Sequence, residues 1–159
     1  MKYLKLVLLF LSITVYSQSG KVVKIKDGDT VVLLDSYNNQ ITLRLAEVDC
    51  PESKQAFGKK AKEFTSNEVG NKIVSYKIIS TDRYGRYIAK IFYGNKYLSE
   101  EIIKNGYGWH YKKYSKSKKL SDLEDNARKN KLGLWNDKNP IEPYVFRKAK
   151  ELKMSGNNY

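Results

Sequence analysis

The sequence has little cysteine, histidine or proline, and these scarcities exclude several kinds of chemistry. Cys50 is the single cysteine, so an intramolecular disulfide and a cysteine-based metal site are excluded. His110 is the single histidine, which excludes the nucleases that need two or more. Any chemistry that the chain performs must therefore use carboxylates, arginines, tyrosines and water.

The chain also lacks an apolar run long enough to cross a bilayer. The run from Leu6 to Val15 is about half of the roughly 20 apolar residues that a spanning helix needs. Lys2 and Lys5 precede it, and small or modest residues follow at Val15 and Ser17, as in a secretory signal peptide. The sequence predicts export to the medium or the periplasm, with residues 1–17 removed and no membrane anchor.

Acidic residues are few relative to basic ones. The sequence has 17 Asp and Glu against 30 Lys and Arg, for a net charge of +13, and loss of the two leader lysines leaves +11. A basic domain of this size implies an anionic partner, either a nucleic acid or a membrane surface. The 13 tyrosines and two tryptophans favour nucleic acid, because aromatic faces stack on bases.

The hydrophobic pattern predicts a small barrel, with turns at Asp27-Gly28 and at residues 35–39. Strands are expected around residues 22–25, 30–34, 41–45, 72–80 and 86–93, and helices over 53–69, from a cap at Asn95 to Gly106, and from about 118 to 130. Five strands with a helix between the third and fourth are typical of an OB-fold. We therefore expect an α+β, mainly β fold: a five-stranded OB-fold barrel with three helices over residues 18–137, followed by a partly loose extension over 138–159.

The segment Asp27-Gly28-Asp29-Thr30 has two interpretations. A match of this kind is usually only a hairpin turn. A functional interpretation requires a second carboxylate nearby, and Asp49, at the end of the third strand, could supply it at the same rim of the barrel. Two adjacent carboxylates repel each other unless a cation neutralises them, and oxygen ligands favour Ca²⁺ or Mg²⁺.

Two arginines and a glutamate extend this pattern. Arg44 lies five residues before Asp49, Arg86 opens the fifth strand, and Glu52 follows the third. Singly, each arginine would be an ordinary surface residue, but an arginine can grip a phosphate through two parallel hydrogen bonds. With a metal on one phosphate oxygen and a carboxylate to position or deprotonate water, the set suits phosphodiester hydrolysis.

Four blocks of sequence closely resemble the staphylococcal nuclease (thermonuclease) family. These blocks are Asp27-Gly28-Asp29-Thr30-Val31, Arg44-Leu45-Ala46-Glu47-Val48-Asp49-Cys50-Pro51-Glu52, Asp82-Arg83-Tyr84-Gly85-Arg86 and Lys131-Leu132-Gly133-Leu134-Trp135. Their order and spacing agree with the family pattern, and the resemblance covers roughly residues 22–135.

The resemblance implies a role for each matching residue. Asp29, Asp49 and the main-chain carbonyl of Cys50 would ligate Ca²⁺, and Glu52 would be the general base. Arg44 and Arg86 would hold the scissile phosphate, and Arg86 could also assist the leaving group. Arg83 and Tyr84 fall where the family contacts a terminal phosphate, and Tyr111 and Tyr114 are the favoured candidates for base stacking.

Some positions depart from the best-known member of the family. Cys50 replaces a threonine, which is tolerable if only its carbonyl is a ligand, and Arg83 replaces a lysine. Glu47 stands where an apolar residue is usual, and either faces solvent or adds negative charge near the metal. His110, Trp109 and Trp135 are interpreted as packing or surface residues rather than as catalytic groups or base platforms.

The resemblance thus implies a secreted, monomeric, Ca²⁺-dependent nuclease. It would hydrolyse single-stranded DNA and RNA, and duplex DNA when frayed, with little sequence preference, leaving 3′-phosphate ends. The alternative is a non-catalytic OB-fold module that binds nucleic acid, since such barrels often bind strands without cutting them. A protein that merely adheres to anionic surfaces would explain the charge but not the spaced acids.

Overall fold

The strands of the N-terminal half wrap into a barrel. The computed structural model describes residues 18–156, so the signal peptide predicted over residues 1–17 lies outside the described residues. The strands, in chain order, are β1 (Gln18–Asp27), β2 (Thr30–Leu34), β3 (Gln40–Leu45), β4 (Val48–Asp49), β5 (Ile73–Thr81), β6 (Tyr87–Tyr93), β7 (Lys96–Tyr97) and β8 (Trp109–His110).

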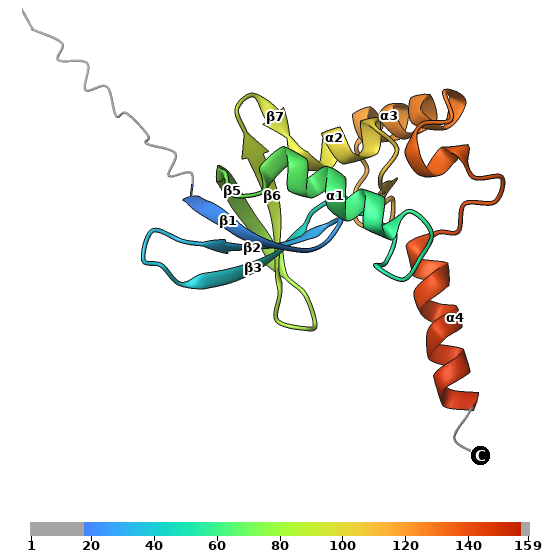
Figure 1. Cartoon of the computed structure of the whole chain (residues 1–159), viewed down its shortest axis with the longest axis horizontal. Helices are drawn as coiled ribbons and strands as arrows, with labels where there is room; N and C mark the ends of the chain where they lie inside the picture. The colour runs from blue at the N-terminus through green and yellow to red at the C-terminus, as the bar shows by residue number, and fades with distance from the viewer. Residues whose placement is uncertain (1–17, 157–159) are drawn as a thin grey trace, which may run out of the picture.

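One parallel pairing closes the barrel. The sheet runs β3-β2-β1-β5-β6-β7 with antiparallel neighbours, and β3 also pairs with β6 in parallel (Figure 1). In this pairing Arg44 lies opposite Ile88, while on its other side Arg44 lies opposite Thr30 of β2. The predicted five-stranded OB-fold barrel is therefore confirmed, and its closure places Arg44 centrally.

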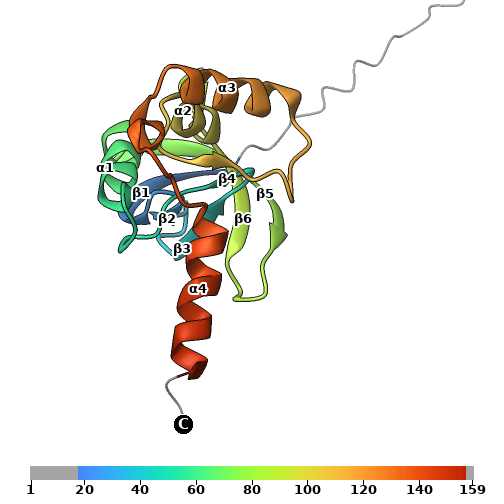
Figure 2. The ribbon, with the colours of Figure 1, turned by 90° about the vertical axis from the view of Figure 1, so that its right-hand side faces the viewer.

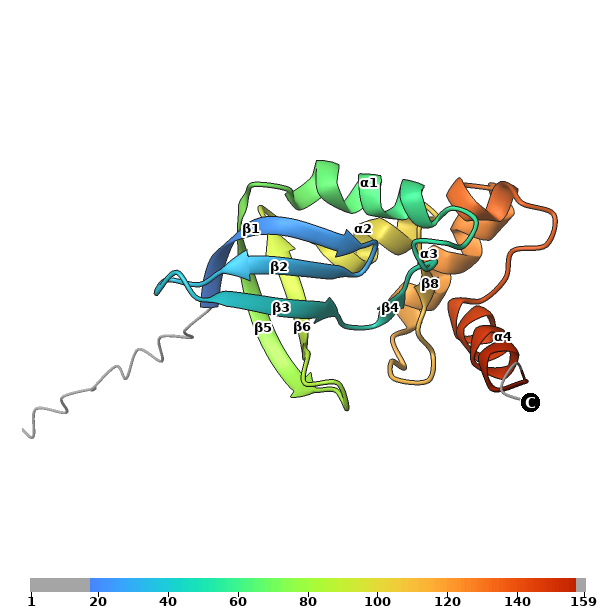
Figure 3. The ribbon, with the colours of Figure 1, turned by 60° about the horizontal axis from the view of Figure 1, so that its bottom comes forward.

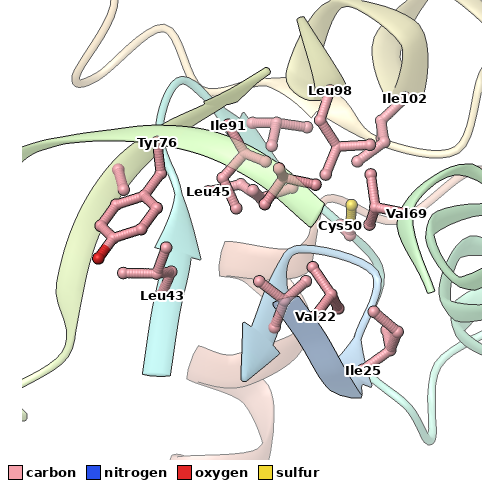
Figure 4. Packing of buried hydrophobic residues seen from close by; sticks show 14 of the residues in the cluster. Val22, Ile25, Leu43, Leu45, Cys50, Val69, Tyr76, Ile91, Leu98 and Ile102 are labelled. Atoms are coloured by element: carbon pink, nitrogen blue, oxygen red, sulfur yellow. The ribbon is translucent and has the colours of Figure 1, made fainter. Parts of the chain in front are cut away.

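The barrel interior is filled by apolar, mostly aliphatic, side chains from strands β1 to β6 (Figure 4). In β1, Val22 and Ile25 face the core, whereas the exposed positions between and beside them hold Val23 and three lysines. The helices α1 (Gly58–Val69) and α2 (Leu98–Lys104) close over the same core with Ala61, Val69 and Ile102. Cys50 is buried in this cluster, because its small side chain behaves as an apolar group there.

The helices lie on one side of the barrel and beyond one end (Figures 1 and 3). They are α1 (Gly58–Val69), α2 (Leu98–Lys104), α3 (Lys118–Lys129), the 3₁₀ turn η1 (Gly133–Asn136) and α4 (Pro143–Gly156). The predicted three helices correspond to α1, α2 and α3. Ser117 caps α3, its side chain accepting a hydrogen bond from the backbone N–H of Leu120.

Two predicted helix starts were wrong. Asn95 caps no helix: it lies in the turn between β6 and β7, and Tyr97 precedes the first residue of α2. The helix predicted from residue 53 begins only at Gly58, because Phe57 adopts a left-handed conformation with φ 63°. Residues 53–57 therefore form turns, and these turns carry the chain from Glu52 to α1.

A fourth helix, α4, forms within the C-terminal extension. Pro143 lies at its first position, where the missing N–H of proline costs nothing. The start of α4 is tied to the body because Gln55 Nε2 donates to the carbonyl of Ile141 at 2.6 Å, and Phe146 lines a pocket with Pro51 and Phe57. From this attachment the helix runs away from the barrel (Figure 2). Within residues 18–156, no helix has the length and apolarity needed to cross a membrane.

Candidate active site

The turn between β1 and β2 presents Asp29 at the barrel rim. Thr65 of α1 donates its hydroxyl to the carbonyl of Gly28 at 2.6 Å, which fixes the turn against the helix. A Cβ on Gly28 would stand 2.8 Å from the Cβ atoms of Ala61 and Cys50. Glycine is therefore required for this close approach, and the segment is more than a generic hairpin turn.

Arg44 joins the two aspartates that the sequence singled out. Its Nη1 lies 2.6 Å from Asp29 Oδ2, and its Nη2 lies 2.7 Å from Asp49 Oδ1. Asp29 Oδ2 also accepts the backbone N–H of Cys50 at 2.7 Å. The structure thus brings Asp29, Arg44, Asp49 and Cys50 together, although Asp29 is separated from Cys50 by 21 residues in the chain.

The environment of this cluster is almost dry. Asp29, Arg44 and Asp49 are each less than 10% exposed. Burial raises the pKa of Asp49, although hydrogen bonds from an arginine oppose the rise, and burial together with the charge of Asp29 raises the pKa of Asp27 to about 6. Burial alone would lower the pKa of Arg44, but the two aspartates raise it above its ordinary value. Negative charge is therefore concentrated here and needs cations to balance it.

Glu52 lies beside this cluster, in the turn between β4 and α1. Its backbone carbonyl accepts the N–H of Gln55 at 2.8 Å. A Cβ on Gly58 would stand 2.0 Å from that same carbonyl oxygen, so the start of α1 packs tightly on Glu52. The first turn of α1 consequently fixes the backbone position of the predicted base.

Arg147 of α4 is a site residue that sequence reasoning missed. Its Nη2 lies 2.9 Å from Asp49 Oδ2 and its Nη1 lies 2.8 Å from Glu52 Oε1, and Nη1 also donates to Asp49 Oδ1 at 3.2 Å. No sequence motif points to it, because it lies 95 residues or more after its partners and beyond the blocks that resemble a known family.

Arg86 stands apart from the acidic cluster. It is the last residue of the loop between β5 and β6, directly before Tyr87, and its Nε pairs with Asp82 Oδ2 at 2.8 Å. In the part of the chain that the structure describes, it forms no ion pair with Asp29, Asp49 or Glu52. Arg83 and Tyr84 occupy the tip of the same loop, both exposed, with Arg83 Nη2 donating to the Tyr84 hydroxyl at 2.6 Å.

The predicted stacking tyrosines flank the cluster on another segment. β8 pairs with β4 so that Trp109 lies opposite Asp49, and Tyr111, the first residue after β8, donates its N–H to the carbonyl of Glu47. Tyr111 and Tyr114 meet edge to face with ring centroids 4.8 Å apart, and Tyr114 is 68% exposed. The Tyr114 ring also has the Lys113 ammonium over it, 5.3 Å from its centroid, so an exposed aromatic ring and a cation stand together at the border of the site.

Glu47 holds this tyrosine segment in place. Its carboxylate accepts hydrogen bonds from Ser115 Oγ at 3.0 Å and from the Tyr97 hydroxyl at 2.9 Å, and it pairs with Lys90 at 2.8 Å. Burial alone would raise the pKa of Glu47, but the hydrogen bond from Lys90 and the two hydroxyls lower it. Glu47 is thus engaged by three partners and does not simply face solvent, which was one of the two alternatives that the sequence left open.

The three aromatic and imidazole groups beside the site are packing residues. Trp109 and Trp135 pack edge to face at 4.4 Å, and the Arg128 guanidinium lies over both rings. His110 is buried, and its Nδ1 lies 3.0 Å from Ser121 Oγ. These contacts agree with the structural role expected for them.

The oxygen donors at the rim suit a hard divalent cation. Asp29 and Asp49 share one guanidinium, and Asp49 and Glu52 share another, so the carboxylates already hold positive groups between them. Among residues 18–156, no three His, Cys, Asp or Glu side chains form a ready-made ligand cluster. A cation here would bind two carboxylates, with backbone oxygen and water completing its shell, as Ca²⁺ commonly does.

A basic OB-fold barrel with buried carboxylates and arginines at its rim defines a class of small nucleic-acid-processing domain. Residues 42–137 match the family model described as staphylococcal nuclease homologue. The chain therefore belongs to the staphylococcal nuclease family, and the resemblance in the sequence is confirmed.

Bacterial relatives extend the similarity over most of the chain. The chain is 41% identical over 135 residues to an uncharacterized endonuclease of Haemophilus influenzae, covering 85% of this chain and 76% of that protein. It is 32% identical over 152 residues to an uncharacterized endonuclease of Escherichia coli O157:H7, covering 94% and 99%. It is 34% identical over 142 residues to a micrococcal nuclease of Shigella flexneri, covering 82% and 80%.

Proposed function

We propose that this chain is a secreted Ca²⁺-dependent nuclease that hydrolyses phosphodiester bonds of DNA and RNA. It acts with little sequence preference and leaves 3′-phosphate ends. The observation that carries the proposal is the buried array of Asp29, Arg44 and Asp49, because a module that only binds nucleic acid has no need to bury two carboxylates at its basic rim.

The metal would be held by Asp29, Asp49 and the carbonyl of Cys50, which together provide only oxygen ligands. Bound there, Ca²⁺ supplies charge stabilisation to a phosphate oxygen and lowers the pKa of water. The thiol of Cys50 takes no part: it is fully buried, and burial together with the charge of Asp29 raises its pKa well above the ordinary value.

Glu52 serves as the base in this proposal. Its carboxylate is the least buried of the three acids, with a side chain 38% exposed against 8% for Asp29 and 4% for Asp49. Water can therefore reach it from solvent. Glu52 takes a proton from that water as the water oxygen attacks phosphorus. The bond from phosphorus to the 5′-oxygen breaks, the departing 5′-oxygen takes up a proton from solvent, and the phosphate remains on the 3′-oxygen.

The arginines bind and stabilise the phosphate. Arg44 is fixed by two ion pairs, so its guanidinium is already oriented when substrate arrives. Arg86 has a side chain 34% exposed and pairs with Asp82, and it would turn from that partner toward the phosphate and the departing 5′-oxygen. Arg83 and Tyr84 would contact a terminal phosphate of the substrate, and Tyr111 and Tyr114 would stack on its bases.

An assay on single-stranded DNA tests the proposal. The protein without residues 1–17 is incubated with end-labelled DNA in Ca²⁺ and then in chelator, and the product ends are identified by their susceptibility to a 3′-phosphatase. We expect cleavage that requires Ca²⁺ and yields 3′-phosphates. Tight, salt-sensitive binding without cleavage would support the alternative, an OB-fold module that binds nucleic acid.

Secretion has its own test. Expression of the full chain with its leader should release into the periplasm or the medium a protein whose N-terminus lies near residue 18. Protein retained in the cytoplasm with Met1 intact would contradict export.

A further inference from the structure

The α4 helix delivers a positive charge to the acidic rim. The Arg147 guanidinium bridges Asp49 and Glu52 through three hydrogen bonds of 2.8–3.2 Å, which use both of its terminal nitrogens. The two carboxylates raise the pKa of Arg147 above its ordinary value, although burial alone would lower it. The guanidinium is thus held as a cation by the acids of the predicted site.

Arg147 contacts carboxylate oxygens of Asp49 that a metal would also need as ligands. Asp49 Oδ2 accepts from Arg147, while Asp49 Oδ1 is shared between Arg44 and Arg147. Asp29 Oδ2 is in turn engaged by Arg44 and by the N–H of Cys50. The carboxylates of Asp29 and Asp49 therefore already face positive or hydrogen-bonding groups. A divalent ion on Asp49 would stand close to the Arg147 guanidinium, and like charges at such a distance repel strongly.

The position of α4 allows Arg147 to leave without unfolding the barrel. The Arg147 side chain is 34% exposed, and the helix joins the body through a segment beginning after η1. Its N-terminal end meets the barrel and the remainder extends outward (Figure 2). Displacement of the guanidinium therefore disturbs no buried apolar side chain of the barrel core.

From these observations we infer that Arg147 is an internal counter-ion of Asp49 and Glu52, and that it competes with Ca²⁺ for Asp49. This inference rests on the proposed metal site. Without metal, Arg147 neutralises the acids and holds α4 to the rim; with metal, the guanidinium is displaced from Asp49 and this contact between α4 and the rim is lost. Because the two cations compete for one carboxylate, a change that weakens the docking of Arg147 strengthens metal binding, by at most the factor by which docking is weakened.

Calcium titration by calorimetry, on the full chain after leader removal, tests the inference directly. Arg147→Gln removes the guanidinium, and Lys148→Gln is the matched control, because Lys148 is exposed and, among the described contacts, forms no ion pair. Both variants lose one positive charge from the same helix, and Gln is a good helix former. We expect Arg147→Gln to bind Ca²⁺ about tenfold more tightly than Lys148→Gln.

The outcomes separate this inference from the proposed function. If Arg147→Gln and Lys148→Gln bind Ca²⁺ equally, or if Arg147→Gln binds more weakly, the competition is overturned while the metal site stands. If neither variant nor the unsubstituted chain binds Ca²⁺, the metal site and the competition both fail.

Discussion

The roles of Asp29, Asp49 and Arg44 at the rim follow from the ion pairs that they form with one another. Asp29 and Asp49 differ from ordinary surface acids because both are buried on one arginine. Replacing a buried charged partner leaves the other charge uncompensated, which typically costs about 3–5 kcal/mol. Arg44 thus stabilises the rim in addition to the phosphate binding proposed for it, and its substitution would confound the two effects.

His110 provides a clean probe of the packing next to the site. It is the single histidine of the chain, and burial lowers its pKa from the usual value of about 6.5. Its imidazole signals in proton NMR should therefore titrate below pH 6.5. The unfolded chain takes up this proton at a higher pH than the folded chain does. The contribution of His110 to folding stability should therefore fall as the pH drops through 6.5, and it should level off below the pKa of His110 in the folded protein. Titration at or above pH 6.5 would contradict the buried position.

Glu47 should act through the tyrosine segment and not through the metal. Glu47→Ala removes the contacts to Ser115, Tyr97 and Lys90, so we expect a stability loss of about 1–3 kcal/mol together with weaker binding of single-stranded DNA. Glu63→Ala, which changes an exposed acid on α1, is the control. Denaturant unfolding and DNA binding measure the two effects, and unchanged DNA affinity in Glu47→Ala would disprove the positioning role.

At the scale of elements, the start of α1 determines where Glu52 stands. Gly58→Ala would place a Cβ 2.0 Å from the Glu52 carbonyl oxygen, so the backbone must shift. Alanine normally favours a helix by about 1 kcal/mol over glycine, but here we expect destabilisation by about 1–3 kcal/mol and reduced cleavage. Lys59→Ala is the matched control on the next, exposed residue. A Gly58→Ala protein as stable and active as the control would contradict the close packing.

The elements also show how far the sequence could predict the site. Period-two patterns and turn residues predicted the barrel strands, and short motifs within the blocks predicted Asp29, Arg44, Asp49 and Glu52. The start of α2 was misplaced because Gly94-Asn95 reads equally well as a cap or as the turn of a hairpin. Arg147 could not be predicted, because its contact with Asp49 depends on the path of a C-terminal segment 98 residues away.

At the scale of the whole molecule, the charge governs encounter with nucleic acid. Affinity for single-stranded DNA should fall linearly in a plot of log K against log salt concentration, with a slope of roughly −0.7 for each phosphate neutralised. Fluorescence titrations at several salt concentrations measure this slope. Affinity that does not change with salt would contradict a basic surface as the source of binding.

The central claim is that this basic barrel cuts nucleic acid rather than merely binding it. The most direct measurement compares the unsubstituted chain with Glu52→Gln in Ca²⁺, recording cleavage and binding of the same single-stranded DNA. We predict that Glu52→Gln binds about as tightly as the unsubstituted chain but cleaves about 10²–10⁴-fold more slowly, the range that general-base catalysis contributes. Equal cleavage by the two proteins, or no Ca²⁺-dependent cleavage by either, would contradict the account.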